Sequence, residues 1–415
     1  WRFRAERRAG VQGGTHLSAK TKAAGSKDKT YEDIRRKIAD GDVVVMTAEE
    51  FKAFVKANGT KKAAEEVDVV TTGTFGAMCS SGAYINFGHS EPPIKMQRIW
   101  LDGVPAQAGL AAVDGYIGAT ALDDTNNMAH GGAHVIEDLV RGKAVRLRAT
   151  GYGTDCYPRK EIDTYVSLRT VNQAVLMNVR NCYQNYAAAS NSTSKTLYTY
   201  MGKLLPELGN ATFSSAGELS PLLNDPYYRT IGIGTRIFLG GAQGYVMWEG
   251  TQFYPGAPRT PNGVPKRPAG SLGVIGDLKQ MSPEFLKGLT FTRYGSSLGI
   301  GIGVPIPILD EDMARHCAVT NSDILTAVFD YGQATRSRPV LREASYADLR
   351  SGEIEIKGKR VPTSPLSSLF KARQVSEALK SWILKGEFMI QEPVQSFPKD
   401  RAMKTLDVRT EREAT

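Results

Sequence analysis

The first part of the chain alternates short apolar runs with a capped amphipathic segment, and this order constrains the fold more than any other feature. Residues 42–46 (DVVVM) and 67–71 (VDVVT) are rich in β-branched side chains, which favours buried strands. Between them Thr47 is followed three residues later by Glu50, the spacing of a capping box at a helix start. Strand, helix and strand in this order predict an α/β fold.

Later segments extend this prediction to mixed sheets with helices on the outside. Residues 144–149 alternate apolar and arginine side chains, as a half-buried strand does, and residues 354–361 read as a hairpin about a central glycine. We expect helices at residues 171–179 and 366–384. The stretch from residue 214 to residue 309 is rich in glycine and proline, and we expect it to form a second lobe.

Charge divides the chain unevenly. The net charge is +9, but residues 1–29 contain eight Lys or Arg and two acidic residues, so the remainder carries only +3. A leader rich in Gly, Ala and Ser cannot bury a core. We therefore expect a disordered basic leader at residues 1–29, one domain at residues 30–390 and a charged tail at residues 391–415. The small charge of the domain argues against nucleic acid as a partner.

The cysteines and apolar runs indicate a cytoplasmic protein. The four cysteines are widely spaced, which excludes zinc-ribbon and iron–sulfur motifs and fits free thiols in a reducing compartment. No signal peptide is visible, and the most apolar run, residues 298–309, is too short to cross a membrane. His130 and His134 have a helical metal-ligand spacing, but two glycines lie between them, so we expect no metal site.

Cys156 is the preferred nucleophile on chemical grounds. It follows the strand predicted at residues 144–149, in a loop of Gly, Thr and Asp, and such loops often contain catalytic groups. Arg159 and Lys160 favour a thiolate, whereas Asp155 opposes it. The alternative is a buried, inert cysteine, the commoner environment of a free thiol.

Three further features are candidates for the same site. Cys79 lies in the sequence MCSSG, where small residues let a ligand approach the backbone; the alternative is a tight turn in the core. Arg236, in a glycine-rich segment, could clamp a carboxylate or belong to a packed turn. Cys182, at the end of the helix expected at residues 171–179, and Cys317 are assigned structural roles. Whether Cys79 and Cys156 meet in space stays open at this point.

Several long and unusual stretches resemble the homocysteine biosynthesis family, the L-aspartate semialdehyde sulfurtransferases of anaerobic bacteria and methanogens. These stretches are residues 68–96, 131–140, 148–162, 219–252, 275–288 and 337–356. The resemblance implies an enzyme that places sulfide-derived sulfur on L-aspartate 4-semialdehyde and reduces the adduct to L-homocysteine. It also implies that Cys79 and Cys156 are the motif cysteines, with Cys156 the essential one.

The resemblance further implies a mechanism with no tightly bound cofactor. By the chemistry of these residues, a persulfide on Cys156 would attack the C4 carbonyl, and Cys79 or another thiol would open the S–S bond. The two electrons would come from a separate, reduced ferredoxin-like iron–sulfur protein. Charged residues near these loops are candidates for binding the substrate's own charges. They are Arg159, Lys160 and Arg236 for the carboxylate, and Asp155 and Glu249 for the ammonium group.

Two other functions are consistent with the sequence. One is a non-catalytic scaffold or sensor subunit that binds an amino acid within a sulfur-metabolism complex, and such a protein needs no reactive thiol. The other is a different thiol enzyme, such as an acyl transferase. That enzyme would need a histidine base beside its thiol, and none is close to Cys156 in the sequence.

Overall fold

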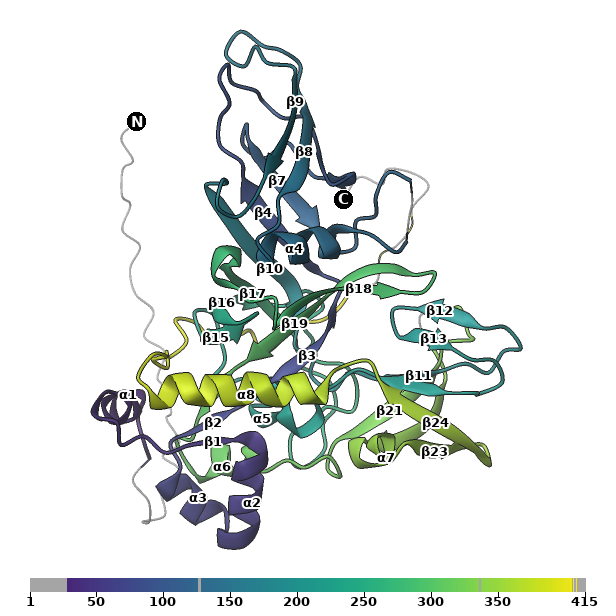
Figure 1. Ribbon diagram of the computed structural model, residues 1–415. Helices are drawn as coiled ribbons and strands as arrows, with labels where there is room; N and C mark the ends of the chain where they lie inside the picture. Colours follow the sequence, from purple (N-terminus) through teal and green to yellow (C-terminus); the bar gives the residue numbers. More distant parts are fainter. Residues whose placement is uncertain (1–27, 126–127, 336, 405, 407, 409–415) are drawn as a thin grey trace, which may run out of the picture.

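The computed structural model describes residues 28–125, 128–335, 337–404, 406 and 408, so most of the predicted leader lies outside the described residues. The described part is a mixed α/β fold of several sheets with helices packed on the outside (Figure 1). This confirms the predicted fold class. The helices are α1 (Tyr31–Asp40), α2 (Ala48–Asn58), α3 (Thr60–Glu66), α4 (Gly132–Val140), α5 (Pro221–Asn224), α6 (Glu311–Cys317), α7 (Tyr346–Arg350) and α8 (Leu369–Leu384).

A nine-stranded sheet forms the centre, in the order β18-β19-β15-β16-β17-β10-β4-β7, with β3 also paired to β19. Its strands are β3 (Thr74–Met78), β4 (Ser81–Asn86), β7 (Asp114–Gly118), β10 (Gln173–Asn181), β15 (Arg236–Leu239), β16 (Ala242–Glu249), β17 (Leu272–Asp277), β18 (Leu286–Phe291) and β19 (Gly295–Gly303). The pairs within it are antiparallel, so hairpin turns such as the one between β15 and β16 lie at its edges.

Smaller sheets surround the central one. A six-stranded sheet consists of β22 (Val340–Ser345), β21 (Leu325–Asp330), β11 (Ala188–Ser190), β14 (Ala211–Phe213), β24 (Lys359–Pro365) and β23 (Glu353–Ile356). A four-stranded sheet consists of β6 (Val104–Ala106), β5 (Arg98–Leu101), β8 (Val145–Thr150) and β9 (Glu161–Val166), and β8 and β9 project at one end of the molecule (Figure 1). The remaining strands are β1 (Val45–Thr47), β2 (Val69–Thr71), β20 (Pro305–Pro307), and the hairpin β12 (Leu197–Thr199) with β13 (Gly202–Leu204).

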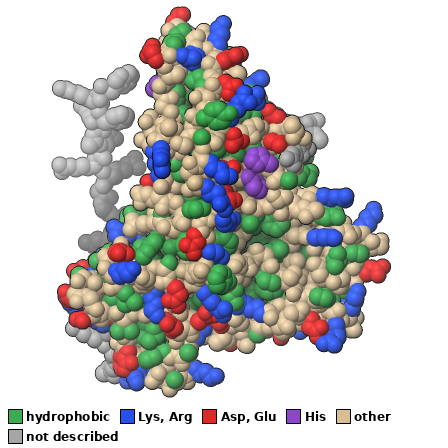
Figure 2. Space-filling model, viewed as in Figure 1, with side chains coloured by type: hydrophobic (Ala, Val, Ile, Leu, Met, Phe, Trp, Pro, Cys, Tyr) green, Lys and Arg blue, Asp and Glu red, His purple; other side chains and the backbone are tan. Residues whose placement is uncertain are grey.

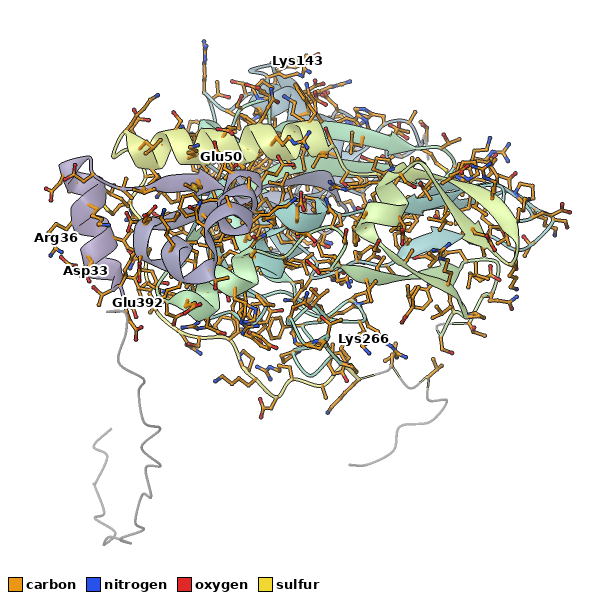
Figure 3. All side chains as sticks on the ribbon, turned by 90° about the horizontal axis from the view of Figure 1, so that it is seen from below. Asp33, Arg36, Glu50, Lys143, Lys266 and Glu392 are labelled. Atoms are coloured by element: carbon orange, nitrogen blue, oxygen red, sulfur yellow. The ribbon has the colours of Figure 1, made fainter. Side chains whose placement is uncertain are left out.

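Helix α8 lies across β3 and β19 and covers that face of the central sheet (Figure 1). Its Val375 and Leu379 are fully buried. The helix approaches the chain closely at Gly73, where a Cβ atom would lie 2.2 Å from the carbonyl oxygen of Ala372. Glu50 of α2 forms an ion pair with Lys380 of α8 at 2.6 Å, which joins the two helices at the surface (Figure 3).

Local signals in the sequence placed most elements correctly. Thr47 and Glu50 form the predicted capping box, and Thr30 caps α1 in the same way. The predicted strand at residues 144–149 is β8, and the hairpin at residues 354–361 is formed by β23 and β24.

The helix expected at residues 171–179 is wrong: these residues belong mainly to strand β10. Leu176 and Met177 favour helices when isolated. In the fold, however, β10 is paired on both sides, by β4 and β17, and buried and less buried residues alternate along it. Pairing on both sides outweighs the local helix preference.

A buried lysine leads to a prediction about pH dependence. Burial lowers the pKa of Lys52 in α2 to about 8, and its ammonium group donates to the carbonyl oxygens of Ala48 and Glu218, each at 3.0 Å. The unfolded chain therefore binds more protons than the folded one between about pH 8 and 10.5, so this residue makes stability rise with pH in that window. Replacing Lys52 with methionine should remove this rise, changing the stability difference between the proteins by about 2–3 kcal/mol across the window.

Denaturant unfolding of both proteins at pH 7.5 and pH 10 measures this difference. Other groups that titrate in this range are common to both proteins and cancel in the comparison. Equal pH dependence of the two proteins would contradict a lowered pKa for Lys52.

None of the helices in the described residues is long and apolar enough to cross a membrane. On the face shown in Figure 2, basic and acidic side chains are interspersed and do not gather into one basic patch.

Candidate functional site

The side chain of Cys79 lines a cavity that is larger than the hollow beside Glu249. It lies in the turn between β3 and β4, is half-buried, and its Sγ atom is 3.2 Å from the hydroxyl oxygen of Ser297 on β19. The cavity has a volume of about 710 Å³ and lies between the central sheet and the six-stranded sheet. A cavity of this size holds a small molecule with room for a second reactant.

Five tyrosines line this cavity. They are Tyr183, Tyr186, Tyr200, Tyr294 and Tyr331. Tyr183 and Tyr186 have ring centroids 4.7 Å apart, and the hydroxyls of Tyr200 and Tyr331 are 2.8 Å apart. Burial is the largest cause that raises the pKa of four phenols of the cavity, those of Tyr183, Tyr186, Tyr294 and Tyr331. Those phenols therefore stay protonated at neutral pH and can donate hydrogen bonds to a ligand.

The charged residues among the described lining of the cavity are all basic. They are Arg180, Arg267 and Arg338, and no Asp or Glu lines the cavity in the part of the chain that the structure describes. Arg338 lies over the ring of Tyr331 at 4.0 Å. Three guanidinium groups without a lining carboxylate favour an anionic ligand.

Cys156 lies elsewhere, in the loop between β8 and β9, and does not line the cavity. It is exposed. Arg159 holds the loop in place, because its guanidinium donates to the carbonyl oxygens of Glu91 and Pro92 at 2.6 and 3.0 Å. The ring of His89 stacks on that of Tyr157 at 6.1 Å, so the fold brings a histidine to the loop that the sequence did not place there.

The other predicted substrate residues are dispersed. Asp155 and Lys160 share the loop of Cys156. Arg236 donates to the carbonyl oxygen of Met389 at 3.4 Å. Glu249 forms an ion pair with Arg401 at 3.2 Å and lines a second hollow of about 480 Å³. None of these predicted residues lines the Cys79 cavity.

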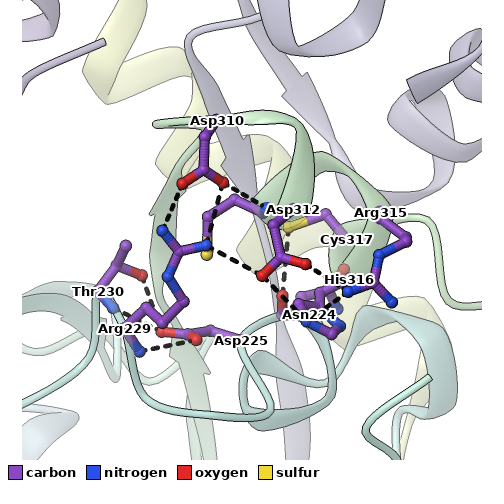
Figure 4. Close-up of polar contacts among 10 residues, drawn as sticks. Asn224, Asp225, Arg229, Thr230, Asp310, Asp312, Arg315, His316 and Cys317 are labelled. Atoms are coloured by element: carbon purple, nitrogen blue, oxygen red, sulfur yellow. Dashed lines mark hydrogen bonds and ion pairs between the residues drawn. The ribbon is translucent and has the colours of Figure 1, made fainter. Parts of the chain in front are cut away.

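The remaining two cysteines are buried. Cys317 ends α6, where its thiol donates to the carbonyl oxygen of Asn224 at 3.3 Å (Figure 4), and burial raises its pKa. Cys182 borders the cavity, but it follows strand β10 and not the expected helix, and burial raises its pKa to about 12. Both thiols are therefore protonated at neutral pH and are poor nucleophiles.

Among the described residues, no group of three His, Cys, Asp or Glu side chains is placed to hold a metal ion. The rings of His130 and His134 are 5.6 Å apart, and the hydroxyls of Thr290 and Ser296 lie 3.2 and 3.4 Å from the nitrogens of His134. The pair thus contacts neighbouring side chains.

The sequence reasoning missed Arg180 and the tyrosines. Arg180 lies near the end of β10, in the region that was assigned to a helix and its end. The tyrosines come from two separate regions, residues 183–200 and 294–331, so only the alternation of residues 173–181 could have indicated part of this wall.

Comparisons with known proteins show which family the chain is similar to. A family profile described as "Homocysteine biosynthesis enzyme, sulfur-incorporation" matches residues 43–390. An L-aspartate semialdehyde sulfurtransferase of Methanosarcina acetivorans is 52% identical over 91% of this chain and 74% of its own length. One of Methanocaldococcus jannaschii is 53% identical over 89% of this chain and 73% of its own length.

A more distant relative, an uncharacterized protein of Methanothermobacter thermautotrophicus, is 31% identical over 79% of this chain and 73% of its own length. No solved structure matches the chain. The profile covers most of the chain, including Cys79, Arg180 and Cys156. The chain belongs to the homocysteine biosynthesis family of sulfur-incorporating enzymes.

Proposed function

We propose that this protein transfers sulfur to L-aspartate 4-semialdehyde and forms L-homocysteine. The observation that carries the proposal is the half-buried thiol of Cys79 in a cavity lined by arginines and tyrosines. An amino-acid aldehyde brings a carboxylate for a guanidinium and a carbonyl for a sulfur nucleophile. The two relatives that are more than half identical have this activity in their names.

The reaction is a reductive sulfur transfer. Sulfur adds to the C4 carbonyl, water leaves, and the resulting thioaldehyde takes up two electrons and two protons to become the thiol. One aldehyde, one hydrogen sulfide, two electrons and two protons thus give one homocysteine and one water. We propose that a separate ferredoxin-like iron–sulfur protein supplies the electrons, with no tightly bound cofactor in this chain. We propose that phenols of the cavity donate to the oxygen that develops charge at C4.

Cys156 is the proposed sulfur acceptor. Its exposure lets a persulfide donor, which already carries sulfane sulfur, pass that sulfur to the thiol without entering the cavity. Asp155, Arg159 and Lys160 are on the same loop, so their proposed role belongs to the loading of sulfur on Cys156. Cys79 is the proposed thiol that opens the S–S bond at the substrate. This step leaves a disulfide between Cys79 and Cys156, and two further electrons from the iron–sulfur protein return both residues to thiols.

An anaerobic assay tests this function. The purified protein is incubated with L-aspartate 4-semialdehyde, sulfide and a reductant, and homocysteine is measured by mass spectrometry. We expect homocysteine only when all three are present. Heat-denatured protein is the control, because aldehydes and sulfide also react without a catalyst. Binding of the aldehyde without any homocysteine would instead favour the non-catalytic scaffold or sensor.

A further inference from the structure

Arg180 and Cys79 are held in a fixed relation by a buried pair of side chains. Asn178 on β10 and Ser81 on β4 form the last register pair between these strands. The amide of Asn178 donates to the Ser81 hydroxyl at 2.7 Å, and its carbonyl oxygen accepts from the backbone N–H of Arg180 at 2.8 Å. Cys79 precedes Ser81 by two residues and Arg180 follows Asn178 by two residues. In an antiparallel pair these are matching steps at the same end of the two strands.

The guanidinium of Arg180 is oriented before any ligand binds. Its Nε atom donates to the hydroxyl of Thr251 and its Nη1 atom to the side-chain oxygen of Gln252, both at 2.9 Å. Together with a hydrogen bond to the phenol of Tyr183, these two bonds use three of the five N–H groups of the guanidinium and leave two for a ligand. Both Arg180 and Cys79 act on the phenol of Tyr183, whose pKa is raised mainly by burial and lowered by the guanidinium. Cation and thiol therefore border the same part of the cavity.

Arg338 is less suited than Arg180 to a short substrate that reaches Cys79. Arg338 lies against Tyr331, and Tyr200 contacts both Tyr331 and Tyr294. Cys79 acts electrostatically on the phenol of Tyr294. The rings of Tyr200 and Tyr331 therefore lie between Tyr294 and Arg338. Arg338 therefore lies farther along the cavity wall from the thiol than Tyr294 does.

We infer that Arg180 binds the α-carboxylate of the amino-acid aldehyde and so directs its C4 atom toward Cys79. This inference rests on the proposed function. It assigns substrate recognition to a residue of strand β10 and not to the charged residues around Cys156. It also implies that aldehydes with a carboxylate are preferred over aldehydes without one.

Kinetics of Arg180→Met and Arg180→Lys with three aldehydes test the inference. For L-aspartate 4-semialdehyde, and for succinic semialdehyde, which keeps a carboxylate but lacks the amine, we expect Arg180→Met to raise KM at least about tenfold. A charge-assisted hydrogen bond of ~1.5 kcal/mol or more corresponds to this change. With 3-aminopropanal, which lacks the carboxylate, variant and wild type should be equal. Arg180→Lys keeps the charge and should give a smaller rise.

The matched control is Arg35→Met, which removes an arginine from the surface of α1, where it pairs with Glu32. It should leave KM unchanged. If wild type turns over the aldehyde and both Arg180 variants have wild-type KM values, the inference is overturned while the proposed function stands. If wild type gives no homocysteine, the proposed function itself fails. If Arg180→Met does not fold, the result of Arg180→Lys decides.

Discussion

Replacing Cys79 with serine is expected to lower homocysteine formation at least about a hundredfold, a loss of ~2.7 kcal/mol of transition-state stabilisation. A serine hydroxyl stays protonated at neutral pH and does not open an S–S bond, whereas a thiol can do so. The thiol lies in a surface turn and contacts the hydroxyl of Ser297, which can also bond to a serine. The fold should therefore persist, and circular dichroism together with the melting temperature checks this.

Cys317→Ser is the matched control for this variant. It makes the same chemical change at a buried thiol outside the cavity, where a serine can still donate to the carbonyl oxygen of Asn224. We expect its kcat to be within about twofold of wild type, a change of less than ~0.5 kcal/mol. Full activity of Cys79→Ser would show that the cavity positions the substrate without a thiol and would remove Cys79 from the mechanism.

Replacing Cys156 with serine is expected to lower turnover at least about a hundredfold when a persulfide donor supplies the sulfur. The thiol is exposed and its loop is held by the backbone contacts of Arg159, so the change should not affect the fold. Wild type incubated with the donor should gain the mass of one sulfur atom on Cys156, and the variant should not. A fully active variant would refute the covalent carrier, and free sulfide in the cavity would then be the nucleophile.

Mixing the two variants shows where the thiols meet. Cys156 does not line the cavity of its own chain. Recovery of activity in a mixture of Cys79→Ser and Cys156→Ser would mean that sulfur passes between two chains. A mixture as inactive as its components would mean that both thiols must belong to one chain, and that the loop of Cys156 moves during the reaction.

Features that depend on neighbouring residues could be predicted from the sequence. The capping box at Thr47, the alternating strand β8 and the hairpin of β23 and β24 were all predicted, because a cap or an alternation involves groups only a few residues apart. The family was also evident, since its motifs are continuous stretches of sequence that the comparisons confirm. The short loops singled out Cys79 and Cys156 as candidate thiols.

The surroundings of those thiols depend on tertiary packing and could not be predicted. Strand β10 was mistaken for a helix because its leucine and methionine favour helices locally, whereas pairing with β4 and β17 is a long-range effect. The cavity at Cys79 combines Arg180, Tyr294 and Tyr331, which come from three distant segments. Cys79 lines this cavity, whereas Cys156 lies outside it and is exposed. Side chains that meet only after the sheets pack leave no local pattern, so their meeting could not be inferred from the order of the residues.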